Sequence, residues 1–220
     1  QLPFLDKVIM TYAKDKKSEL LAFRNKEIDL VLEIPVEEIE NILGSLQDAQ
    51  AGKNVKHKVE SKSSMSMNYI ALANESAEFK NVDVRKAFNL AIDRNDLVDH
   101  WLLGEGWAAE NGFVPTMDNF PNEKVKGHTY NVAQAQALLA KAGYPGGKGF
   151  PVLDFYVNAI EGSAPHKMCM GIAAQIKQNL GIDLKIKLCT IEEREKAIAS
   201  GKAKIWRSGW IADYPDAENF

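Results

Sequence analysis

The sequence of 220 residues lacks the features that mark several broad classes of protein. It has no apolar run near the roughly 20 residues that a membrane-spanning helix needs. Lysine and arginine total 27 against 30 aspartate and glutamate residues, a net charge of −3. The chain therefore lacks the basic excess of a charge-driven nucleic-acid binder, and it shows no charge pattern for docking on anionic membranes. With 45% apolar residues, it has the composition of an ordinary globular protein with a substantial core.

Cysteine is nearly absent. Only Cys169 and Cys189 are present, and their spacing fits neither a CxxC motif nor a zinc-binding arrangement. Cys169 falls on a helical pattern and Cys189 at the end of a strand pattern. We interpret both as small buried apolar residues, with a disulfide between them as the alternative in an oxidising compartment.

Motifs of catalytic sites are also missing. The sequence contains no GxSxG nucleophile elbow and no GxxxxGK[ST] phosphate loop. The four histidines, His57, His100, His128 and His166, fall in separate segments and form no metal motif, so we interpret them as surface or loop residues. We therefore expect that the protein is not an enzyme and that it binds neither a metal nor a cofactor. The alternative is a hydrolase that uses Asp213 or another carboxylate with His128 or His166.

Apolar periodicity predicts helices and strands in alternation. Strands are expected at residues 5–12, 27–32, 55–62, 65–73, 152–157, 182–188 and 203–208. Helices are expected over residues 36–46, 97–102, 168–180 and 192–200. Three further helices are expected to begin at a capping residue: one at Ser18, one at Asp83 that runs to Ile92, and one at Asn131 that runs to Ala142. Such alternation indicates crossover connections and an α/β fold with a mixed sheet flanked by helices. Residues 104–129 are rich in glycine, proline and asparagine and predict a long loop, a candidate cleft edge.

Residues 205–216 contain the best candidates for ligand binding. They leave a strand pattern for a turn, and open α/β sheets bind ligands at the carboxyl ends of their strands. Arg207 can pair with a carboxylate and Asp213 with an ammonium group, while Trp210 and Tyr214 would supply apolar walls. This set suits a zwitterionic, partly apolar ligand. The alternative is that the tryptophans of the segment belong to the core and its charged residues to a solvated turn.

Four stretches carry a family resemblance, in the order the family has them. Residues 84–94 (VRKAFNLAIDR) resemble the signature VRxAxxxAIDR, and residues 2–8 (LPFLDKV) resemble a PYLDKI strand. Residues 26–29 (KEID) resemble a GEID turn, and residues 210–220 (WIADYPDAENF) resemble WxADYPDPxNF. All four motifs are typical of the bacterial family 5 extracellular solute-binding proteins, the oligopeptide-, dipeptide- and nickel-binding receptors of ABC importers. Two turn positions differ from the pattern, Lys26 for glycine and Ala217 for proline.

The resemblance implies a receptor of two lobes that close around a ligand. It identifies residues 1–220 as a single, partial α/β ligand-binding lobe of the periplasmic-binding-protein-like class II fold. The N-terminal lobe and a C-terminal return segment are expected outside the chain, which begins at Gln1 without a methionine or signal peptide. The implied function is that of a substrate-binding component that delivers peptides or a similar small solute to the permease subunits of an ABC importer.

The resemblance also assigns residues. In peptide-binding members the aspartate of the WxADY element, here Asp213, pairs with the ligand's α-ammonium group. The tryptophan three residues earlier, here Trp210, lies beside the ligand, and Arg207 occupies a place from which an arginine can meet a short peptide's carboxylate. Arg85, Asp93 and Arg94, in the helical signature, are expected to be structural.

Several properties of the protein follow as expectations of the same resemblance. The protein is expected in the periplasm or otherwise outside the cytoplasm, free or lipid-anchored, as a monomer that binds no nucleic acid. The ligand stays open among peptides, nickel complexes, haem, opines and sugars. A further alternative is a sensory receptor domain that transports nothing.

Overall fold

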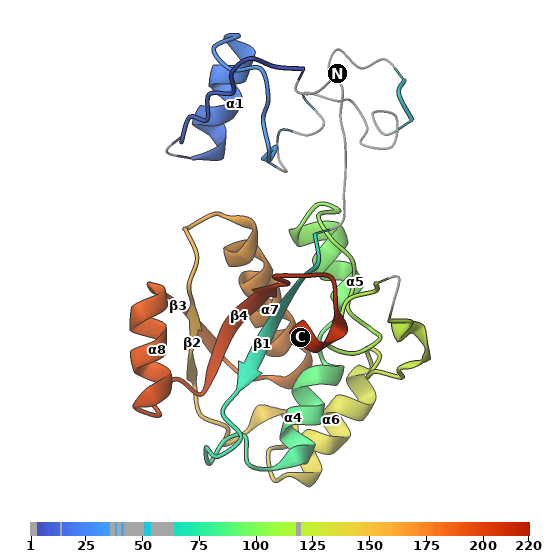
Figure 1. The fold of residues 1–220 in the computed structure, drawn as a ribbon. Coiled ribbons are helices and arrows are strands. Elements are labelled where there is room, and N and C mark those ends of the chain that lie inside the picture. Colours follow the sequence, from blue (N-terminus) through green and yellow to red (C-terminus); the bar gives the residue numbers. More distant parts are fainter. Residues whose placement is uncertain are drawn as a thin grey trace. The chain divides into compact units, whose positions relative to one another are not determined.

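The computed structural model describes residues 4–13, 15–35, 38, 41, 51–53, 64–117 and 120–220 (Figure 1). The chain divides into two compact units, Gln1–Lys62 and Ser63–Phe220, which are described in turn. None of the helices in the described residues is both long and apolar enough to span a bilayer.

The helix of the first unit, α1 (Lys16–Arg24), is capped by Asp15. The Asp15 carboxylate accepts hydrogen bonds from the Ser18 backbone N–H at 2.9 Å and from the Ser18 hydroxyl at 3.0 Å. The predicted cap at Ser18 is therefore wrong by three residues. The aspartate ahead of it already satisfies a free N–H group of the first turn, so the helix begins earlier.

The strands predicted at 5–12 and 27–32 are not formed. Val8, Ile9 and Tyr12 are 71%, 73% and 93% exposed. A strand needs a hydrogen-bonded neighbour, and no ladder among the described residues includes either segment. The helix predicted at 36–46 lies almost wholly outside the described residues, and the strand predicted at 55–62 lies entirely outside them.

The second unit is built on a four-stranded sheet in the order β1-β4-β2-β3. The strands are β1 (Ser66–Leu72), β2 (Leu153–Val157), β3 (Leu184–Leu188) and β4 (Ile205–Ile211). β1 runs antiparallel to β4, whereas β2 is parallel to both β3 and β4. This is the mixed sheet that the sequence predicts, because each parallel pair is joined through a crossover that contains a helix.

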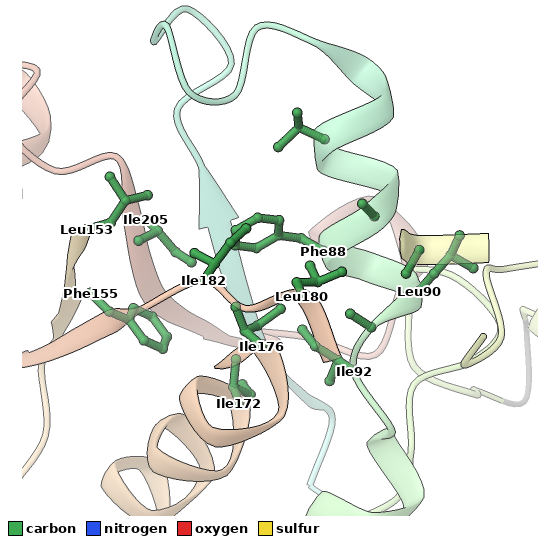
Figure 2. Close-up of a cluster of buried hydrophobic side chains, with 14 of the residues drawn as sticks. Phe88, Leu90, Ile92, Leu153, Phe155, Ile172, Ile176, Leu180, Ile182 and Ile205 are labelled. Carbon is green, nitrogen blue, oxygen red and sulfur yellow. The ribbon is translucent and has the colours of Figure 1, made fainter. Parts of the chain in front are cut away.

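The helices of this unit are α4 (Val82–Leu90), α5 (Arg94–Asp96), the π-helical turn η2 (Leu97–Trp101), α6 (Val132–Lys141), α7 (Ala164–Leu180) and α8 (Ile191–Ala199), with 3₁₀ turns η3 (Asn122–Lys124), η4 (Pro145–Gly147) and η5 (Ala217–Asn219). α4, α6 and α7 pack on one face of the sheet, where Phe155 of β2 and Ile205 of β4 are fully buried. α8 packs on the other face, where Ala197 meets Tyr156. Figure 2 shows Phe88 and Ile176 reaching the first of these cores from α4 and α7.

Local signals place several helix ends. Asn131 caps α6 as predicted, since its side-chain oxygen accepts the Gln134 N–H at 2.9 Å. Gly181 ends α7 as predicted, at a φ of 72° that favours glycine. The cap of α4 is Asn81 rather than the predicted Asp83, whose N–H donates to the Asn81 side chain.

The helical signature at residues 84–94 is structural, as expected. Asp93 caps α5 by accepting the N–H groups of two following residues. The buried Gln175 of α7 accepts the Asp93 N–H at 2.8 Å and donates to its carbonyl at 3.2 Å. Arg94 donates to the Asn89 side chain at 3.0 Å. These bonds tie α4 and α5 to α7.

Both cysteines are free. Cys169 is fully buried in α7, and Cys189 is half-buried after β3. The interpretation as a small buried residue is confirmed for Cys169 and is wrong for Cys189, which is only half-buried, and the alternative disulfide is not formed. In the described part of residues 104–129 the structure is mostly irregular, as predicted, and Phe113 meets Tyr69 of β1 edge to face, with ring centroids 4.8 Å apart.

Candidate ligand-binding site

β4 is paired on both sides only at its start. Ile205 and Trp206 lie opposite Phe155 and Tyr156 of β2, whereas β1 pairs with β4 along its whole length, up to Ile211. Residues 207–211 therefore separate from β2 and stay in the sheet through β1 alone. This opening lies at the carboxyl ends of the parallel strands, the place where open α/β sheets bind ligands.

Arg194 of α8 bridges this opening. Its Nη1 donates to the Asn158 side-chain oxygen, just beyond β2, at 2.6 Å and to the Arg207 carbonyl at 3.1 Å. The Arg194 side chain is 12% exposed, although it also pairs with Glu195 at 2.6 Å. The guanidinium thus takes the place of the missing ladder between β2 and β4. Sequence reasoning missed Arg194, because a helical arginine between two glutamates is typical of an exposed face.

The predicted site residue Arg207 is half-buried. Its Nη2 donates to the Asn68 side-chain oxygen on β1, while its Nε is buried without a hydrogen-bond partner among the described residues. Burial lowers the pKa of Arg207, and the positive charge of Arg194 lowers it further. The guanidinium therefore has donor capacity that the surrounding residues do not use.

Trp210 and Asp213 are held together by Asn219 of η5. The Asn219 side-chain oxygen accepts the Trp210 indole N–H at 2.8 Å and the Asp213 backbone N–H at 3.0 Å. One amide oxygen therefore closes the turn after β4 and orients the indole. Asn219 was missed as a site residue, although it is the asparagine of the WxADYPDPxNF pattern, which could have indicated it.

Asp213 and Tyr214 of this turn are exposed. The Tyr214 hydroxyl donates to Glu218 at 3.1 Å. The Asp213 side chain is exposed, and its carboxylate pairs with no other residue that the structure describes. Trp210 and Tyr214 are 44% and 47% exposed. The alternative, with the tryptophans in the core and Arg207 and Asp213 in a solvated turn, fits Asp213 but neither Trp210, which is exposed, nor Arg207, which is half-buried on β4.

The structure groups three of the four predicted residues. Trp210, at the end of β4, is bonded through Asn219 to the turn that contains Asp213 and Tyr214. Arg207 lies on the other face of β4 from Trp210, because side chains alternate along a strand. The arrangement is a strand end with a cation on one face and an aromatic ring on the other, followed by a free carboxylate.

Large apolar side chains are exposed around this strand end. Ile160 follows β2, Ile191 begins α8 after β3, and Ile211 ends β4, and they are 79%, 62% and 71% exposed. We call these three residues the isoleucine rim. Exposed apolar groups gathered at one edge are typical of surfaces that a ligand or another part of a protein covers.

The histidines take local roles. His100 bonds Asp96 at 2.9 Å, and His166 Nδ1 accepts the Gly162 N–H at 2.9 Å, while His128 is exposed. His57 lies outside the described residues. Among those described, no histidine pairs with Asp213, and no three metal-ligating side chains gather to hold an ion.

Comparison with known families matches residues 1–220 to the bacterial extracellular solute-binding proteins, family 5 Middle. Heme-binding protein A of Haemophilus influenzae is 27% identical over 221 residues, which cover 98% of this chain and 38% of that protein. The periplasmic oligopeptide-binding protein OppA of the same organism is 31% identical over 157 residues, covering 68% of this chain and 28% of the relative.

Solved structures show the same fold. The periplasmic binding protein DppA of Helicobacter pylori, in complex with the peptide STSA, matches 94% of this chain with a TM-score of 0.70 and 26% identity. The match covers 37% of that chain. The 220 residues therefore span less than two fifths of the length of each of these relatives.

Proposed function

We propose that this chain, which belongs to the bacterial extracellular solute-binding proteins of family 5, forms part of one lobe of the substrate-binding component of an ABC-type importer. The protein would bind a peptide or a similar small solute between two lobes and deliver it to membrane permease subunits. The observation that carries the proposal is the turn after β4, where Asn219 holds Trp210 beside Asp213, whose carboxylate is exposed.

Each group in the proposed site has a chemical task. The Asp213 carboxylate pairs with the ammonium group of the ligand, an interaction that gains strength when closure excludes water. Arg207 meets a ligand carboxylate with its guanidinium, whose one hydrogen bond among the described residues goes from Nη2 to the neutral Asn68 side chain. Trp210 and Tyr214 supply flat apolar surface at small entropic cost, because each has few rotatable bonds.

The relatives support a peptide as the first ligand to test. Their names include oligopeptide-, dipeptide-, heme- and nickel-binding proteins. We choose peptides among these because the site contains both a cation and an anion, as the termini of a peptide require. Nickel is less suited to this part of the chain, since no group of metal ligands is found in the described residues.

The proposal extends to the setting of the protein. It acts outside the cytoplasm, free or held by a lipid anchor, as a monomeric receptor whose partners are its solute and the permease. It binds without catalysis and needs no cofactor. The two-lobed arrangement, with residues 1–220 contributing most of one lobe, belongs to the same proposal.

Peptide binding by the full-length protein tests the proposed function. The protein is mixed with an equimolar library of tripeptides and examined by native mass spectrometry and titration calorimetry. Asp213→Asn is expected to weaken binding at least about tenfold, because it leaves the ligand ammonium without its charged partner. Asp99→Asn, an exposed substitution with the same change of charge, is the control. Equal affinity in both variants would remove Asp213 from the site, and no peptide binding by the wild type would refute the proposal.

A further inference from the structure

The Arg207 side chain lies along the face of the sheet towards β1. In the register of the two strands, Asn68 is opposite Gly209 and Ile70 is opposite Arg207. The guanidinium therefore reaches past Gly209 to the Asn68 side chain, which accepts its Nη2 hydrogen bond. Because Arg194 also holds the Arg207 carbonyl, both the backbone and the head group of Arg207 are fixed.

Gly209 leaves room for this path. A Cβ at position 209 would lie 3.2 Å from Asn68 Oδ1 and 3.3 Å from Arg207 Nη2. Both distances are shorter than ordinary van der Waals contact, so any larger residue would press on the two partners of the hydrogen bond. The hydrogen bond between Asn68 and Arg207 therefore explains, on steric grounds, why a glycine suits position 209.

The charge of this arrangement is not balanced. Asn68 is neutral, so it fixes the guanidinium without cancelling its charge. In the described parts of the chain no carboxylate forms an ion pair with Arg207, and the nearby thiol of Cys169 is kept protonated, because burial raises its pKa to about 12. A half-buried cation that is held in place but not neutralised favours an anion as its partner.

We propose that Asn68 is a specificity-determining residue that makes the site select ligands carrying a carboxylate. It holds Arg207 with a neutral amide and so leaves the positive charge for the ligand. An aspartate at the same position would accept the same hydrogen bond but would neutralise Arg207. The inference rests on the proposed function, because it assigns the chemistry of the ligand group that meets Arg207.

The test compares two probes in the full-length protein. One is an equimolar tripeptide library with free carboxyl termini, and the other is the same library with C-terminal amides. Apparent affinities are measured by calorimetry, and the acid-to-amide ratio is the readout. We expect the wild type to favour the acids by about tenfold or more, and Asn68→Asp to reduce that ratio about tenfold, because the new carboxylate competes with that of the ligand.

Two further variants keep the test decisive. Gln178→Glu on the exposed side of α7 adds the same charge and should keep the wild-type ratio. Asn68→Ser adds no charge and is too short to hold the guanidinium, so its ratio should fall several-fold, and it replaces the aspartate variant if that one does not fold. A wild type that binds acids and amides equally, or Asn68 variants that keep its ratio, would overturn the inference while peptide binding stands. Binding of neither library would refute the proposed function itself.

Discussion

Replacing Arg194 with methionine tests how the open end of β4 is held. Methionine keeps the apolar stem of the buried side chain but removes the guanidinium. The Asn158 oxygen, at 2.6 Å, and the Arg207 carbonyl, at 3.1 Å, both lose their donor. A hydrogen bond from a charged group contributes about 1.5–3 kcal/mol, and the pair with Glu195, whose side chain is 56% exposed, adds about 0–1 kcal/mol. Since removal also relieves the desolvation of a mostly buried cation, we expect a net loss of about 2–4 kcal/mol in the free energy of unfolding.

Urea unfolding followed by circular dichroism measures this loss. Lys196→Met is the matched control on the same helix, because Lys196 pairs with Glu192 at 2.6 Å and the two side chains are 74% and 77% exposed. It should change the free energy of unfolding by about 0.5 kcal/mol or less. In the full-length protein, Arg194→Met should also weaken tripeptide binding, since the backbone of Arg207 is released. If the two methionine variants unfold at the same urea concentration, Arg194 does not replace the missing ladder between β2 and β4.

Three further substitutions or treatments test other parts of the structure. Asn219→Ala frees the Trp210 indole and should weaken tripeptide binding by the full-length protein about tenfold. Asn219→Asp keeps an acceptor oxygen and should restore most of the affinity. Equal affinities of the wild type and Asn219→Ala by calorimetry would argue against this role of Asn219. Burial raises the pKa of Cys169 to about 12, so this thiol should resist iodoacetamide near pH 8 in the folded protein, and the half-buried Cys189 should react first. Peptide mass spectrometry measures the order of labelling, and the reverse order would contradict the burial of Cys169. Phe155→Ala removes a fully buried ring and should lower the free energy of unfolding in urea by about 3–5 kcal/mol, whereas a loss below about 1 kcal/mol would mean that the ring is not part of the core.

Predictions from the sequence succeeded where the deciding interaction is local. Asn131 caps α6 and Gly181 ends α7 because a cap side chain and a left-handed glycine act within one turn of the chain. The caps at Ser18 and Asp83 failed by a few residues, since a polar residue just upstream was free to take the same N–H groups.

Predictions failed where the deciding partner is distant in the sequence. The strand at 5–12 has a strand-like pattern, but a pattern does not supply the neighbour that a ladder needs. Arg194 and Asn68 act on Arg207 from two other elements, one helix and one strand, and neither carries a local mark of that role. Sequence could place Arg207, Trp210, Asp213 and Tyr214 on one segment, but not on which face of β4 each would lie.

The isoleucine rim has a thermodynamic consequence for whatever covers this edge of the sheet. Ile160, Ile191 and Ile211 are all more than half exposed, so their hydration contributes to the heat capacity of the uncovered protein. In the proposed two-lobed receptor, removing that water on closure makes the heat-capacity change of binding negative. In that proposed receptor the binding enthalpy becomes more favourable as the temperature rises, and the slope of this dependence measures how much of the rim is buried on closure.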